Sequence, residues 1–174
     1  LTNAQEGVLG TDPNVGDSDG DGLSDGVEVG LDGDRDPNTE TDPLDDDTDD
    51  DGLTDGTELG ADGVRDPSIE TDPLDPDSDG DGLLDGTEKG LSQPEGDDTD
   101  MGTFVPDADG GATVTDPLNE DSDGGGVSDG MEDSNGNGQV DDQERDPTVQ
   151  ADDALDALCF AEAGCAEGQE SVCM

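Results

Sequence analysis

DSDGDGLSDGVE, residues 17–28, places acidic side chains at its first, third, fifth, ninth and twelfth positions and a glycine at its sixth. This is the spacing of a twelve-residue calcium-binding loop. Calcium takes about six to eight oxygen ligands at roughly 2.3–2.6 Å, so alternate side chains of a tightly curled backbone must point at one ion. The glycine permits the sharp turn that brings the carbonyl of the seventh residue to the same point. The stretch therefore predicts a calcium site.

The same pattern occurs five times along the chain. Glycine at position six and glutamate at position twelve are present in every copy, which chance placement of Asp in an acidic chain would not produce. We call the copies loops one to five and expect each to bind one ion, so that the chain holds about five calcium ions or more. The loops are residues 17–28, 47–58, 77–88, 121–132 and 133–144.

The expected ligands are the side chains at positions one, three, five, nine and twelve and the carbonyl at position seven. Gly125 stands at position five of loop four, so this loop lacks one carboxylate and should bind more weakly or through a water. Loop five, with Val140 at position eight, is the most similar to an EF-hand loop. The expected metal ligands are Asp17, Asp19, Asp21, Leu23, Asp25 and Glu28; Asp47, Asp49, Asp51, Leu53, Asp55 and Glu58; Asp77, Asp79, Asp81, Leu83, Asp85 and Glu88; Asp121, Asp123, Val127, Asp129 and Glu132; and Asp133, Asn135, Asn137, Gln139, Asp141 and Glu144.

The composition argues against a conventional hydrophobic core. Of the 174 residues 25% are apolar, Trp and Tyr are absent, and Phe104 and Phe160 are the only aromatic residues. A formal net charge of −49 with 33% charged residues is, by composition alone, typical of a disordered chain. The regular placement of Gly, Leu and Pro around the acids instead favours an ordered chain in which bound calcium replaces the core. Without calcium the carboxylates repel one another, so we expect a largely unfolded chain.

The charge also limits the partners and the chemistry. Four basic residues, Arg35, Arg65, Lys89 and Arg145, cannot neutralise a phosphate backbone, so nucleic acid is not an expected partner. There is no apolar span of membrane length and no signal peptide, and the chain begins at Leu1, from which we expect a mature or partial product without membrane insertion. His, a nucleophile elbow and a phosphate loop are all absent, so we do not expect an enzyme or catalytic residues.

Internal repetition organises the chain. A lead-in with a partial repeat (1–16) precedes a repeat array (17–148) and a cysteine-containing segment (149–174). No segment keeps an apolar 3.6-residue period long enough for a substantial helix, and eight of the ten prolines follow Asp, which disfavours helix at that Asp. We therefore expect an irregular, calcium-stabilised repeat array with little regular secondary structure and a short C-terminal helix. The units of the array are 17–46 and 47–76, identical at about 20 of 30 positions, followed by 77–120 and 121–148.

Two segments depart from the repeat. The third unit carries a 14-residue insert between Glu88 and Thr115, which includes Phe104 and is either a surface loop or a contact point for a neighbouring chain. From Ala151 the composition favours the short helix. In an extracellular chain we expect the three cysteines of this segment to form one disulfide with one thiol left over, because a zinc site without His is a poor match; they are Cys159, Cys165 and Cys173.

The loop pattern followed by Thr-Asp-Pro-Leu resembles the thrombospondin type 3 repeat, and more closely its bacterial relatives. The resemblance covers roughly residues 8–148 and is specific in 17–28, 41–58 and 71–88. It implies an elongated array in which the chain wraps a row of calcium ions. The 30-residue spacing of the first loops is longer than in the compact bacterial form. The resemblance further implies that acids outside the loops bind additional ions, the candidates being Asp32, Asp34, Asp36, Asp42, Asp72 and Asp116.

Three of the four cations share one place in the repeat, within Arg-Asp-Pro: Arg35, Arg65 and Arg145. One interpretation is a guanidinium inserted between carboxylates that joins successive turns. The other is a solvated charge without a structural role. The sequence leaves both open.

These features favour a calcium-binding structural protein: a calcium-rigidified spacer, stalk, filament or adhesin subunit that contacts other protein chains or copies of itself. Weak calcium sites are filled where calcium is millimolar, so we expect an extracellular or cell-surface setting, in a bacterium on the resemblance. Two alternatives remain open. A calcium buffer or mineral-binding acidic protein would stay monomeric at saturating calcium. A dockerin-like anchoring module would need two adjacent loops with full helices, which only residues 121–144 begin to resemble.

Overall fold

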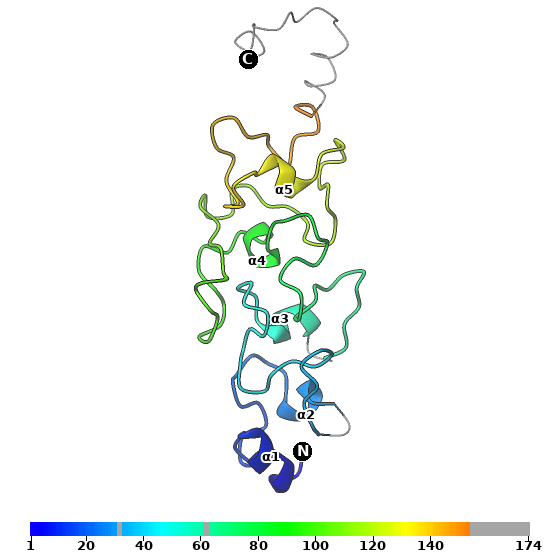
Figure 1. Ribbon diagram of the computed structural model, residues 1–174, viewed down its shortest axis with the longest axis vertical. Coiled ribbons are helices and arrows are strands. Elements are labelled where there is room, and N and C mark those ends of the chain that lie inside the picture. Colours follow the sequence, from blue (N-terminus) through cyan, green and yellow to red (C-terminus); the bar gives the residue numbers. More distant parts are fainter. Residues whose placement is uncertain (31–32, 61–62, 154–174) are drawn as a thin grey trace, which may run out of the picture.

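The chain forms an elongated stack of loops and very short helices (Figure 1). A computed structural model describes residues 1–30, 33–60 and 63–153. Within these ranges no strand occurs, which confirms the expectation of an irregular fold with little regular secondary structure. The cysteines and nearly all of the expected C-terminal helix lie outside the described residues. The helices are α1 Asn3–Leu9, α2 Asp25–Glu28, α3 Asp55–Leu59, α4 Asp85–Glu88 and α5 Asp129–Glu132.

Helices α2 to α5 occupy the same place in loops one to four. Each begins at position nine of its loop and includes position twelve, after a residue with extended backbone. An acidic residue at the start of a helix is favourable because the first backbone N–H groups carry partial positive charge. A helix of four or five residues is not stable alone, so the loop must hold it in place. In return, the helix buries the acids at positions nine and twelve on the inner side of the loop.

Helix α1 was not expected, since residues 1–16 were interpreted as a polar lead-in. It begins with a capping box in which the Thr2 hydroxyl accepts a hydrogen bond from the Gln5 N–H, and the Gln5 side chain accepts one from the Thr2 N–H. It ends at Gly10, whose φ of 97° is left-handed. The signal was present in the sequence as Thr-x-x-Gln followed five residues later by glycine.

The interior is acidic instead of apolar. Among the described residues five hydrophobic side chains are buried, whereas nineteen buried residues are polar or charged. Buried carboxylates are costly unless positive charge or hydrogen-bond donors face them, so this interior needs a partner that the cations of the chain are too few to supply. The buried hydrophobic residues are Leu23, Val29, Leu53, Leu83 and Phe104.

The insert of the third unit folds back across loop two. The backbone N–H groups of Asp97 and Asp98 donate to the Asp46 carboxylate at 2.8 and 3.2 Å. Phe104 is 4% exposed and its ring lies against Gly52, where a Cβ would overlap it. This part of the insert is therefore neither a free surface loop nor an exposed contact for a neighbour, because its anchors lie within the same chain.

Candidate metal sites

Backbone N–H groups of each loop orient its carboxylates. The glycine N–H at position six donates to the position-one carboxylate, as from Gly82 to Asp77 at 3.0 Å. The N–H at position five donates to position three, as from Asp81 to Asp79 at 3.1 Å, and the N–H at position seven donates to position five, as from Leu83 to Asp81 at 2.9 Å. Bonds of the same kind occur in loops one, two and four. Side chains of positions one, three and five are thereby turned inward.

The predicted acids at positions one, three and five meet in loops one to three. In each loop, one oxygen from each of the three carboxylates lies within 4.8 Å of the others. Two ligands at calcium distances from one ion are separated by at most about 5 Å, so the three oxygens can bind one ion together. The clusters are Asp17, Asp19 and Asp21; Asp47, Asp49 and Asp51; and Asp77, Asp79 and Asp81.

Several carboxylate oxygens in these clusters are buried and accept no hydrogen bond. At position three they are the Oδ2 atoms of Asp19, Asp49, Asp79 and Asp123. At position twelve they include Oε2 of Glu28 and Glu88 and both oxygens of Glu58 and Glu132. Buried anionic oxygens of this kind need a positive partner. An all-oxygen set of this density fits a hard divalent cation such as calcium.

The position-twelve glutamates have strongly raised pKa values. Burial raises the pKa of Glu58 to about 11, and the negative charges of Asp49 and Asp51 add to the effect. Burial likewise raises the pKa of Glu28 and of Glu88 to about 9. These carboxyls are therefore protonated in the metal-free fold at neutral pH, and a cation would allow them to ionise.

The position-nine acids accept hydrogen bonds from the start of their own loops, and one of them also lies beside the preceding loop. The N–H at position two donates to each of them, as from Ser18 to Asp25 at 2.8 Å and from Thr48 to Asp55 at 2.9 Å. Asp85 of loop three lies within ligand distance of Asp51 and Glu58 of loop two, and all three are buried. The sequence assigned Asp85 to the ion of its own loop, whereas the structure groups it with acids of the loop before.

Successive loops also share hydrogen bonds. Asp51 of loop two accepts one from the Gly86 N–H at 3.2 Å, and Asp81 of loop three accepts one from the Gly130 N–H at 2.7 Å. Both glycines stand at position ten, where a Cβ would overlap the carbonyl oxygen of the position-five residue. Position ten is glycine in loops one to four and Asp142 in loop five. A glycine at this position therefore distinguishes the stacked loops from loop five in the sequence.

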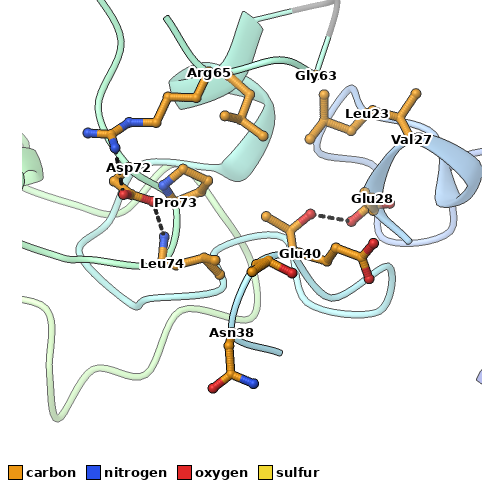
Figure 2. Close-up of a pocket in the computed structure, with 13 residues that line it drawn as sticks. Leu23, Val27, Glu28, Asn38, Glu40, Gly63, Arg65, Asp72, Pro73 and Leu74 are labelled. Atoms are coloured by element: carbon orange, nitrogen blue, oxygen red, sulfur yellow. Dashed lines mark hydrogen bonds and ion pairs between the residues drawn. The ribbon is translucent and has the colours of Figure 1, made fainter. Parts of the chain in front are cut away.

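The Thr-Asp-Pro motifs support the glutamates. Thr41 Oγ1 donates to Glu28 at 3.4 Å and Thr115 Oγ1 donates to Glu88 at 2.9 Å. Both threonines lie outside the twelve-residue loops, so the loop spacing did not indicate them. The Thr41–Glu28 bond lies beside a groove of about 330 Å³ between the first two units, lined in part by Leu23 (Figure 2).

The arginines bind within one unit. Figure 2 shows Arg65 pointing at Asp72. The distance from Arg65 Nη1 to Asp72 Oδ2 is 2.7 Å, and the equivalent distance from Arg35 to Asp42 is 3.1 Å. Each Nε also donates to a threonine carbonyl. The guanidinium thus joins the Arg-Asp-Pro and Thr-Asp-Pro segments of one unit and does not stand between carboxylates of successive turns. Asp42 and Asp72 consequently already have a cationic partner.

The remaining candidates outside the loops make local contacts or lie outside the described residues. Asp36 accepts hydrogen bonds from Asn38, which lower its pKa. Asp116 accepts one from the Leu118 N–H at 3.2 Å. Neither therefore needs an ion to satisfy its carboxylate. Asp32 lies outside the described residues.

Loop five differs from the other four. A turn at residues 142–143 stands in loop five where α2 to α5 stand in the other loops. The amides of Asn135 and Asn137 donate to Asp141 at 3.1 Å, and Asn135 also donates to Glu144 at 2.9 Å. Hydrogen bonds from these amides and from Gln139 lower the pKa of Asp141. The loop that the sequence ranked as most similar to an EF-hand therefore has carboxylates directed to its own amides.

Loop four contains a carboxylate that the sequence did not predict. Asp153 lies within ligand distance of Asp121 and Asp123. It is buried, and no hydrogen-bond donor reaches either of its oxygens. The only signal in the sequence was the gap at Gly125, which did not indicate where a replacement would come from.

No protein-family model matches this chain, and no curated protein or solved structure is significantly similar to it. None of the helices among the described residues is long and apolar enough to cross a membrane.

Proposed function

We propose that this chain is an extracellular calcium-binding structural protein, a calcium-rigidified spacer, stalk, filament or adhesin subunit. The observation that carries the proposal is the convergence of buried carboxylate oxygens without donors in loops one to four. The chain has 53 acids and four cations, so its own basic residues cannot neutralise these clusters. A metal ion can.

Calcium fits better than other metals. The expected ligands are carboxylate, amide and carbonyl oxygens, and the chain has no His. Magnesium keeps most of its waters and demands strict octahedral geometry, whereas calcium accepts a crowded and irregular set of oxygens. Zinc and copper prefer nitrogen or sulfur ligands. Occupation would replace the missing apolar core, because a site with a Kd near 10 μM at about 1 mM calcium adds about 2.7 kcal/mol.

A structural role follows from how the loops are joined. Helices α2 to α5 succeed one another along the long axis in chain order (Figure 1). Loop two contacts loop three, and loop three contacts loop four, through position five of the earlier loop and position ten of the later one. Ions bound in such a row would stiffen a rod, which suits a spacer or a filament subunit.

Small-angle scattering with size-exclusion chromatography tests the proposal. We expect a rod-like particle in 2 mM calcium and an expanded chain in excess chelator. A mass above one chain in calcium would favour the filament. A strictly monomeric particle at saturating calcium would favour the buffer or mineral-binding alternative. An identical expanded profile in both conditions would overturn the calcium-folded array.

The dockerin-like alternative depends on full helices around adjacent loops. In the part of the chain that the structure describes, the helices within loops one to four have four or five residues, and turns follow loop five. These lengths favour the spacer over the anchoring module.

A further inference from the structure

Loop four has a space where the other stacked loops have an acid. Loops one to three carry Asp21, Asp51 and Asp81 at position five, and loop four carries Gly125. A Cβ on Gly125 would overlap Oδ2 of Asp153 and would lie 2.8 Å from Oδ1 of Asp123. The carboxylate of Asp153 thus occupies the space that a position-five side chain would fill.

The surroundings of Asp153 indicate a missing positive partner. Asp153 is 9% exposed and Glu132, which faces it, is 2% exposed. All four carboxylate oxygens of this pair are buried without a hydrogen-bond partner, as is Oδ2 of Asp123. The Arg145 guanidinium lies nearby, with 3.9 Å between its Nη1 and Asp153 Oδ1. This distance is longer than that of a hydrogen bond.

The unit after loop five brings Asp153 to this place. Asp153 follows Arg145 by eight residues, as Pro43 follows Arg35 and Pro73 follows Arg65. It therefore stands where the first two units have the proline of Thr-Asp-Pro. The Asp146 N–H donates to Asp152 at 2.9 Å, which closes a turn within this segment. The Gln150 side chain donates to the Gly124 carbonyl at 2.7 Å, which holds the segment against loop four.

We infer that Asp153 is a ligand of the calcium ion of loop four, in a composite site with Asp121, Asp123 and Glu132. The inference rests on the proposed function and extends it, because a ligand supplied 28 residues after Gly125 ties the segment beyond loop five to the last stacked loop. Loop four then has a full set of carboxylates and binds calcium in the same range as its neighbours. The sequence alone had predicted a weaker site.

Calcium binding at each loop can be measured separately by NMR. The full chain is titrated with calcium, and the amide signal of the position-six glycine reports the loop that contains it. Gly22, Gly52 and Gly82 report loops one to three, and Gly126 reports loop four. We expect Asp153→Asn to weaken the Gly126 transition by at least about tenfold, since affinity depends on the number of charged ligands. The other three transitions should keep their midpoints. Asp142→Asn, an exposed acid outside the cluster, is the charge-matched control.

A second experiment moves the carboxylate from position 153 to position 125. Asp153→Ala removes the carboxylate, and adding Gly125→Asp returns one to position five, where the backbone has no left-handed strain. The double variant should recover the Gly126 midpoint to within about threefold of the parent chain, because the number of charged ligands is restored. An unchanged midpoint in Asp153→Asn, or no recovery in the double variant while loops one to three still bind, would overturn the inference. If no glycine amide responds to calcium, the proposed function itself fails.

Discussion

At the scale of the residue, the acid at position twelve shows how burial and charge oppose each other. Glu58 is 2% exposed, both its oxygens lack donors, and its pKa is raised to about 11. Such a side chain destabilises the metal-free fold when it ionises, and on the proposed function it would stabilise a metal-bound fold. A single substitution can therefore have opposite effects in the two states.

Glu58→Gln should separate these effects. Loss of the charge should weaken calcium binding at loop two by about 10- to 100-fold, because a buried charged ligand becomes neutral. In chelator the same variant should be no less structured than the parent chain, since a costly buried acid is gone. Isothermal titration and circular dichroism measure the two quantities. Glu120→Gln, at an exposed acid, is the control and should alter neither. Unchanged calcium affinity in Glu58→Gln would contradict the ligand assignment.

The raised pKa values also predict how pH acts on the metal-free chain. The folded pKa of Glu28 and Glu88 is about 9, above the usual value of 4.5. A raised carboxyl pKa means that the folded state holds its proton more tightly, so its stabilising effect is present below pH 4.5 and is lost as pH rises to about 9.

We therefore expect the dialysed, metal-free chain to be more compact at about pH 5 than at about pH 8, as judged by hydrodynamic radius. With calcium bound the trend should reverse, because protons compete with the ion for the same oxygens. Equal radii at both pH values without metal would argue against the burial of these acids.

At the scale of the element, the short helices depend on their neighbours. Helix α4 has four residues, and its Gly86 N–H donates to Asp51 of the preceding loop. Position ten thus controls how closely two loops approach. Glycine is required here because a side chain would collide with the preceding loop, and not for its backbone freedom, since the backbone of Gly86 is not left-handed.

Gly86→Ala should push loops two and three apart. The new Cβ would overlap the carbonyl of Asp51, and overpacking of this kind costs about 1–3 kcal/mol. Gly26→Ala is the matched control at the same position of α2, where the nearest atom is the Leu1 nitrogen at 3.4 Å. The control should change stability by less than about 1 kcal/mol, since alanine favours helix. Thermal unfolding in calcium measures the stability of both variants. Equal unfolding midpoints for Gly86→Ala and Gly26→Ala would rule out a tight contact between loops two and three.

At the scale of the whole molecule, acidic clusters succeed one another along a stack of linked loops. The stack has no common apolar core, and its insert bridges back to loop two through Asp46 and Phe104. Removal of the ions should therefore open the whole array and not one end of it. The few cations of the chain offer a direct way to observe this.

Trypsin can cleave only after the four basic residues: Arg35, Arg65, Lys89 and Arg145. In calcium we expect slow cleavage, because Arg35 and Arg65 are held by hydrogen bonds and ion pairs. In chelator we expect rapid cleavage at all four sites. Gel electrophoresis with mass spectrometry follows the fragments, and a small chromogenic substrate controls for trypsin activity in each buffer. Protection by magnesium equal to that by calcium would contradict the choice of metal.

Much of the site could be predicted from local spacing. The acids at positions one, three and five of the first three loops lie together as expected, because twelve residues with a glycine turn impose that geometry. The irregular fold followed from the scarcity of apolar residues. The pattern excluded a substantial helix, and α2 to α5 have only four or five residues. Helix α1 was missed although its capping box stood in the sequence.

The sequence by itself determined the chemistry of this protein. It places an excess of carboxylates at fixed offsets, with too few cations to neutralise them and too little apolar surface to form a hydrophobic core. Only the tertiary structure decided which carboxylates of different segments meet. Asp85 faces loop two, the insert covers loop two, and Asp153 fills the space left by Gly125. These contacts join residues far apart in the chain and depend on how the loops stack, which no spacing within a single repeat encodes.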